Sequence, residues 1–103
     1  MSINNVDYST ITISSASKVL ATESSPTMPS QAHGAVITVE DDQVRWRDDG
    51  TAPTSGEGHL LNVGDTLTFD SWSVPKNNWK QVLNAIRFIR VSTDAKLKIS
   101  WYD

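Results

Sequence analysis

Short segments in which apolar and polar residues alternate with a period of two recur along most of the chain. The clearest are residues 8–14, 44–47, 66–70 and 97–102. This period is typical of a β-strand, whose side chains point alternately to the two faces of a sheet. Clusters of Gly, Asp, Ser and Pro separate the segments, and no long amphipathic helix is indicated. The sequence therefore predicts an all-β fold, an antiparallel β-sandwich or jelly-roll-like barrel of about seven or eight short strands.

Short turns connect three pairs of these segments, and we expect each pair to form a hairpin. The pairs are 35–39 with 44–47, 60–63 with 66–70, and 86–91 with 97–102. The alternation also places Ile11 and Ile13 together on one face of their strand, and it predicts which residues of the later strands face the core, namely Val44, Trp46, Leu67, Phe69, Leu97, Ile99 and Trp101. The order of the strands in a sheet does not follow from this pattern.

The chain of 103 residues has room for a single domain. Residues 34–103 carry most of the strand signals and are expected to form the main part of the sandwich. Residues 1–33 hold one strand at 8–14, a shorter candidate at 18–21, and a Ser/Thr/Pro-rich segment at 24–30. Because Pro26 and Pro29 exclude a long helix or the interior of a paired strand, we interpret this segment as a loop or an extended N-terminal arm.

Composition excludes several classes of protein. The formal charge is −3, and the nine Lys and Arg are spread from Lys18 to Lys98 without forming a stripe, which argues against nucleic acid as a partner. There is no Cys, so neither a disulfide nor a thiolate metal site can stabilise so small a domain, and homo-oligomerisation, for example as a trimer, is a natural supplement. Neither a signal peptide nor a membrane-spanning apolar run is present, so we expect synthesis in a cytoplasm and no membrane partner.

No residue pattern indicates catalysis, a cofactor or a resident metal, and we expect no enzyme activity. The two histidines, His33 and His59, have no His-x-x-x-His spacing that would suggest zinc, and the glycines form no phosphate loop. No serine lies in a nucleophile elbow. One acidic group would bind calcium if its carboxylates converged, although solvated turns use the same residues; it comprises Glu40, Asp41, Asp42, Asp48 and Asp49.

Two large aromatic rings lie in an otherwise polar segment at residues 71–83. A large ring in such a loop either folds back on the sandwich or contacts a partner, and both alternatives stay open. An extended arm would similarly become ordered on a neighbouring protein. The candidate partner-binding residues are therefore Trp72, Pro75, Trp79, Met28 and Pro29.

Three stretches resemble, in this order, a group of small proteins from tailed-bacteriophage and prophage genomes: GAVITVE at 34–40, VRWRDDGTAPT at 44–54 and GHLLNVGDTL at 58–67. The ending, AIRFI at 85–89 followed by AKLKISWY at 95–102, is similar to the same group, and the resemblance covers about two thirds of the chain. Residues 71–83 depart from it, because they form a longer and more Trp-rich connection. The resemblance implies a virion structural protein, of the kind found among head decoration (cement) proteins and small tail or head-to-tail components.

On this resemblance we expect a capsid decoration protein, made in the host bacterial cytoplasm and located in the virion. It would bind the major capsid protein or other virion proteins and stabilise the assembled shell. A tail or adsorption component is the alternative within the same class. A carbohydrate-binding module, in which Trp72 and Trp79 stack on sugar rings, is the alternative from another class.

Overall fold

The computed structural model describes residues 5–30, 32–69 and 85–102. This part of the chain is built mainly from strands, which confirms the predicted all-β class. The strands are β1 (Asn5–Ile13), β2 (Lys18–Val19), β3 (Gly34–Glu40), β4 (Val44–Arg47), β5 (His59–Leu61), β6 (Thr66–Phe69), β7 (Arg87–Arg90) and β8 (Ala95–Tyr102). One helical turn, α1 (Leu20–Glu23), follows β2, and the described residues contain no helix that is long and apolar enough to cross a membrane.

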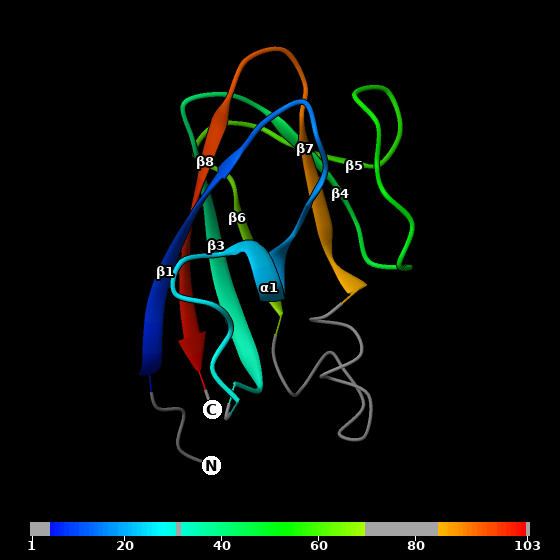
Figure 1. Ribbon diagram of the computed structural model, residues 1–103. Coiled ribbons are helices and arrows are strands. Elements are labelled where there is room, and N and C mark those ends of the chain that lie inside the picture. Colours follow the sequence, from blue (N-terminus) through cyan, green and yellow to red (C-terminus); the bar gives the residue numbers. More distant parts are fainter. Residues whose placement is uncertain (1–4, 31, 70–84, 103) are drawn as a thin grey trace.

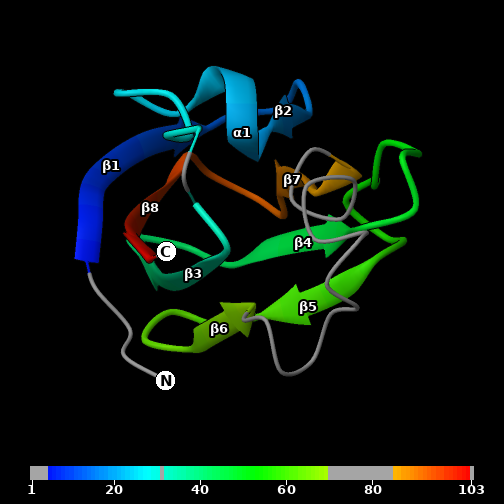
Figure 2. The same ribbon diagram turned by 90° about the horizontal axis from the view of Figure 1, so that it is seen from below.

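The strands form two antiparallel sheets that pack face to face (Figure 1). One sheet has the order β1-β8-β3-β6, and the other has the order β2-β7-β4-β5. The pairs β1–β8, β2–β7, β3–β6 and β4–β5 thus form one long antiparallel ribbon that is wrapped across both sheets, which is the jelly-roll arrangement. Figure 2 shows β1 and β2 along one side of the sandwich and β5 and β6 along the other.

The three predicted hairpins are wrong. In each pair the two strands belong to different sheets, so that the short connections from β3 to β4, from β5 to β6 and from β7 to β8 all cross the sandwich. Three or four extended residues span roughly 10 Å, which is the usual distance between packed sheets, so a short connection suits a crossing as well as a hairpin. Among the described strands, the one pair that is both consecutive and hydrogen-bonded is β4 with β5, joined through residues 48–58.

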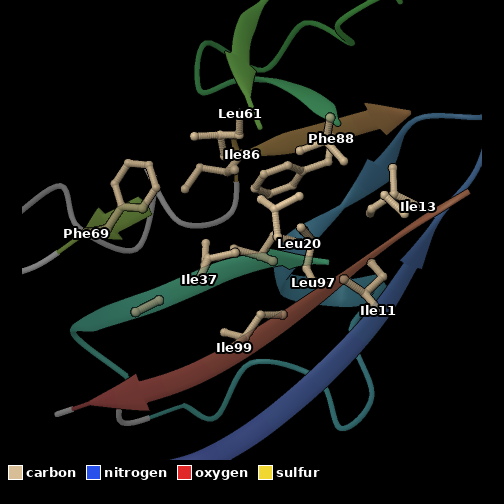
Figure 3. Packing of buried hydrophobic residues seen from close by; sticks show 14 of the residues in the cluster. Ile11, Ile13, Leu20, Ile37, Leu61, Phe69, Ile86, Phe88, Leu97 and Ile99 are labelled. Atoms are coloured by element: carbon tan, nitrogen blue, oxygen red, sulfur yellow. The ribbon is translucent and has the colours of Figure 1, made fainter. Parts of the chain in front are cut away.

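The core lies between the two sheets (Figure 3). Strand β8 contributes Leu97, Ile99 and Trp101, all fully buried, as the alternation predicts. Most of the other predicted core residues are also buried, but Trp46 and Leu67 are partly exposed and pack against the margin of the cluster. Leu67 lies on β6, the edge strand of its sheet, and Trp46 lies on β4 opposite the exposed His59 of the edge strand β5.

The Ser/Thr/Pro-rich segment is a loop that lies on the sandwich; it does not extend away as an arm. Thr10 of β1 and Ser25 exchange two backbone hydrogen bonds, of 3.0 and 2.8 Å. The Met28 N–H donates to the Ala21 carbonyl at 2.9 Å, and the Met28 side chain packs against the core cluster. The loop therefore pairs with part of the outer edge of β1, which would otherwise expose backbone groups to a foreign strand.

A buried hydrogen-bond chain fixes this loop to the sheet. The indole Nε1 of Trp101 donates to Ser9 Oγ at 2.8 Å, and Ser9 Oγ in turn donates to the Pro26 carbonyl at 2.5 Å. Ser9 is fully buried, so this chain gives the indole N–H the acceptor that a buried donor needs. The contact joins β8, β1 and the loop.

Candidate functional site

The residues predicted to bind a partner fall in two places. Trp72, Pro75 and Trp79 lie outside the described residues. Met28 and Pro29 are both partly buried in the loop beside β1, and the core already takes up part of the Met28 side chain.

Strand β4 separates the predicted acidic group into two parts, with Glu40, Asp41 and Asp42 before the strand and Asp48 and Asp49 after it. At one end, Asp42 Oδ2 accepts hydrogen bonds from the Thr93 hydroxyl at 2.5 Å and from the Thr93 N–H at 2.8 Å, while Asp42 Oδ1 accepts one from the Gln43 N–H at 2.8 Å. The bond from the Thr93 hydroxyl is the main cause that lowers the pKa of Asp42, and the two backbone bonds add to it. Asp42 thus joins the β3–β4 connection to the β7–β8 connection, which lie at the same end of the sandwich (Figure 1).

At the other end of β4, Asp49 pairs with Arg47. The Arg47 Nε donates to Asp49 Oδ1 at 3.0 Å, and Arg47 Nη2 donates to Asp49 Oδ2. These bonds are the main cause that lowers the pKa of Asp49, with a further contribution from the Thr51 N–H. Within the described residues no three His, Asp or Glu side chains are placed to hold a metal ion.

A hollow of about 340 Å³ opens where β4 ends and β5 begins. Its lining comprises Arg47, Asp48, Asp49, Glu57, Gly58 and His59. Arg45 holds the loop between the two strands in place, since its Nε donates to the Ser55 carbonyl and its Nη1 to the Gly58 carbonyl, each at 2.9 Å. The hollow is therefore built on the β4–β5 hairpin and on a loop fixed to it.

Two aromatic ring contacts connect the hollow to the core. The ring centroids of His59 and Trp46 are 4.6 Å apart, with an interplanar angle of 39°. Trp46 in turn makes an edge-to-face contact with Phe69 of the other sheet, at 5.6 Å and 87°. The His59 ring is therefore exposed at the hollow and packs against Trp46.

The hollow offers both hydrogen-bond donors and acceptors. Three carboxylates and one guanidinium of the described residues line it. The Arg47–Asp49 pair is already formed, whereas the carboxylates of Asp48 and Glu57 and the imidazole nitrogens of His59 make no hydrogen bond with the rest of the described chain. These groups remain available to a ligand.

Sequence reasoning missed this hollow. The signal was present, because polar residues flank both ends of the Gly-rich loop at 48–58. The predicted hairpin of 35–39 with 44–47 left the two ends of that loop on strands that were not expected to pair. In the structure these strands do pair, and Trp46 lies opposite His59.

Outside the hollow, three large apolar side chains of the described residues are exposed to solvent. Leu60 is 42% exposed on the edge strand β5, and Val63 is 55% exposed in the turn to β6. Tyr8, which is 52% exposed, lies on β1 at the opposite side of the sandwich. Leu60 faces outward, because its neighbour Leu61 is buried in the core.

A scan against protein-family models and searches of curated proteins and of solved structures found no match to this chain. What the protein does is therefore inferred from its own residues and geometry.

Proposed function

We propose that the chain is a structural protein of a tailed-bacteriophage virion, a capsid decoration protein that binds the major capsid protein. The observation that supports this most is where the phage-like stretches lie in the fold. They supply β3, β4, β5 and β8 and much of β6 and β7. These are the contiguous strands β8-β3-β6 of one sheet and β7-β4-β5 of the other.

The resemblance thus follows one connected part of the sandwich, and β1 and β2, outside it, lie together along one side (Figure 2). Eight-stranded jelly rolls occur among viral capsid domains. They also serve unrelated functions, so the fold supports the proposal only in combination with the resemblance.

The side of the sandwich formed by β5 and β6 is the surface that we assign to capsid contact. It carries Leu60 and Val63, both exposed and both within the phage-like stretch at 58–67. The buried centre of a protein interface is depleted of charge and rich in apolar contact. Among the described residues, β5 is also the edge strand of its sheet, and an edge strand can pair with a partner.

Capsids that lack the protein provide the direct test. We expect the purified chain to co-sediment with assembled capsids, but not with free subunits, and to delay the release of DNA on heating, because it binds the assembled state alone. Capsids that neither bind the chain nor change their melting temperature would overturn the proposal. In electron micrographs, label over the whole head supports decoration, whereas label at a single vertex indicates the tail alternative instead.

Two matched variants test the contact surface. Leu60→Ser should weaken capsid binding while leaving the fold intact, because the side chain is already exposed. Tyr8→Ser removes a comparably exposed side chain from the opposite side of the sandwich and should leave capsid binding unchanged. Equal losses in both variants would show that β5 and β6 are not the contact surface.

A further inference from the structure

The hollow between β4 and β5 has the size and support of a binding site for one small polar ligand. Its volume of about 340 Å³ lies at the lower end of the range for small-molecule sites. The hydrogen bonds from Arg45, the Arg47–Asp49 pair and the contact of the His59 ring with Trp46 hold its walls in place. A preformed site loses little conformational entropy when a ligand binds.

The lining suits a ligand that both donates and accepts hydrogen bonds. Asp48 and Glu57 can only accept, as long as they are ionised, while the Arg47 guanidinium can only donate. Hydroxyl groups do both, so neighbouring hydroxyls on one ring would satisfy acidic and basic groups at the same time. The exposed His59 ring adds a flat aromatic surface of the kind that packs against a saturated ring.

The charge of the lining excludes one class of ligand and disfavours another. Among the described lining residues, three carboxylates stand against one guanidinium, and this net negative charge repels phosphates, sulfates and acidic sugars. A simple cation would gain from the carboxylates of Asp48 and Glu57, but it would give no acceptor to the N–H groups of Arg47 that Asp49 does not use. A neutral ring with several hydroxyls incurs neither cost.

We propose that this hollow binds a neutral sugar residue, exposed on a polysaccharide. Carboxylates of Asp48 and Glu57 accept hydrogen bonds from its hydroxyls, Arg47 donates to them, and the sugar ring lies on His59. This site adjoins the capsid contact proposed for β5 and β6, because His59 is the first residue of β5 and precedes Leu60. The two side chains point to opposite faces of the strand, and the sugar proposal does not depend on the capsid proposal.

The test is an NMR titration of the purified chain, without capsids, against glucose, galactose, mannose and N-acetylglucosamine. We expect at least one of them to give saturable shifts at the Gly58 and His59 amides and at the Trp46 indole, with a dissociation constant on the order of 1 mM. Glucuronate, which carries a negative charge, should give none. No saturable shift at these positions with any of the neutral sugars would overturn the proposal.

Matched variants show which groups hold the sugar. Glu57→Gln should weaken binding about fivefold, because it removes the charge of the acceptor and replaces one of its two accepting oxygens by a donor, and His59→Ala should do so through lost ring contact. Glu40→Gln changes an exposed carboxylate at the other end of β4 and should bind as the unmodified chain does. Leu60→Ser should keep sugar binding, which separates this site from the capsid contact.

The titrations also distinguish a sugar site from a site for an organic cation. Tighter binding of the amides of arginine or lysine than of any neutral sugar, abolished by high salt, would also overturn the proposal. Glu57→Gln would weaken that binding too, so the ligand series, not the variant, decides between sugar and cation.

Discussion

At the scale of single residues, Gly58 is the position where backbone geometry most constrains the chain. Its φ is +131°, and an added Cβ would lie 3.1 Å from both the Pro53 Cβ and the Trp46 carbonyl. We therefore expect Gly58→Ala to lower the free energy of unfolding by about 1–3 kcal/mol, measured by urea denaturation.

A second glycine of the same loop is the control for that change. A Cβ at Gly56 would meet no atom of the described residues within 4 Å, and Gly56 does not have a positive φ. Gly56→Ala should leave stability unchanged or raise it by up to about 1 kcal/mol, because it restricts the unfolded chain. If the two substitutions destabilise equally, the close approach at Gly58 is not what fixes the loop.

Asp42 should give the fold part of its sensitivity to acid. Hydrogen bonds from the Thr93 hydroxyl, and then from the Gln43 and Thr93 N–H groups, lower the pKa of Asp42 below its ordinary value of 3.8. The folded state then binds fewer protons than the unfolded state, so the stabilisation is complete above this value and is lost as the pH falls through the lower, folded pKa. Asp42→Asn should lower stability at neutral pH and flatten its dependence on pH between about 2 and 4.

Urea denaturation at a series of pH values checks this prediction. Thr93→Val removes the hydroxyl that is the main donor to Asp42. It should therefore also reduce the dependence of the unfolding free energy on pH between about 2 and 4. A slope in Asp42→Asn equal to that of the unmodified chain would contradict the assigned cause.

At the scale of strands, the alternation predicted where strands lie but not which strands pair. Each of the eight described strands overlaps a segment expected from the sequence, and the buried face of β8 is the predicted one. Period-two alternation determines the face that turns inward, and in a sandwich the inner faces of both sheets have the same pattern. Neither alternation nor a connection of three or four residues therefore decides between a hairpin and a crossing.

The same limit explains what could be predicted of the candidate sites. The loop at 48–58 was recognised as a turn region, but its ends form a hollow only because Trp46 pairs with His59 across β4 and β5. Similarly, nothing in the local sequence of 24–30 indicates that Ser25 pairs with Thr10 on the edge of β1. Both are contacts between segments, which depend on the path of the whole chain.

The contact between Ser9 of β1 and Trp101 of β8 should contribute strongly to the pairing of these two strands. Ser9→Ala would leave the buried indole N–H without its acceptor, at an expected cost of about 1–3 kcal/mol in unfolding free energy. Ser100→Ala removes a hydroxyl from the opposite face of β8 and should change stability by less than about 0.5 kcal/mol. Similar losses in chemical denaturation would show that the buried hydrogen bond contributes nothing particular.

At the scale of the whole molecule, the jelly roll pairs the first strand with the last. Asn5 lies opposite Tyr102 and Ile13 lies opposite Ala95, so the two ends of the described chain are neighbours in one sheet (Figure 1). Strand β2 likewise pairs with β7, and β3 with β8. Such distant pairings must be brought together before they stabilise the fold, which makes folding slow for a chain of this size.

A circular permutant tests whether these pairings limit the folding rate. In this permutant Asp103 is joined directly to Met1, and the chain is opened between Asn77 and Asn78. Strands β8 and β1 are then linked through Asp103 and residues 1–4, a length suited to a hairpin loop. This brings β8 close to β1 in sequence, shortens the separation of β2 from β7, and leaves β4 next to β5. Because folding rates rise as contacting residues come closer in sequence, we expect refolding in stopped-flow fluorescence to accelerate about tenfold, with the same circular dichroism spectrum. Unchanged or slower refolding of a permutant with the native spectrum would show that another step, not the pairing of β1 with β8, limits the rate.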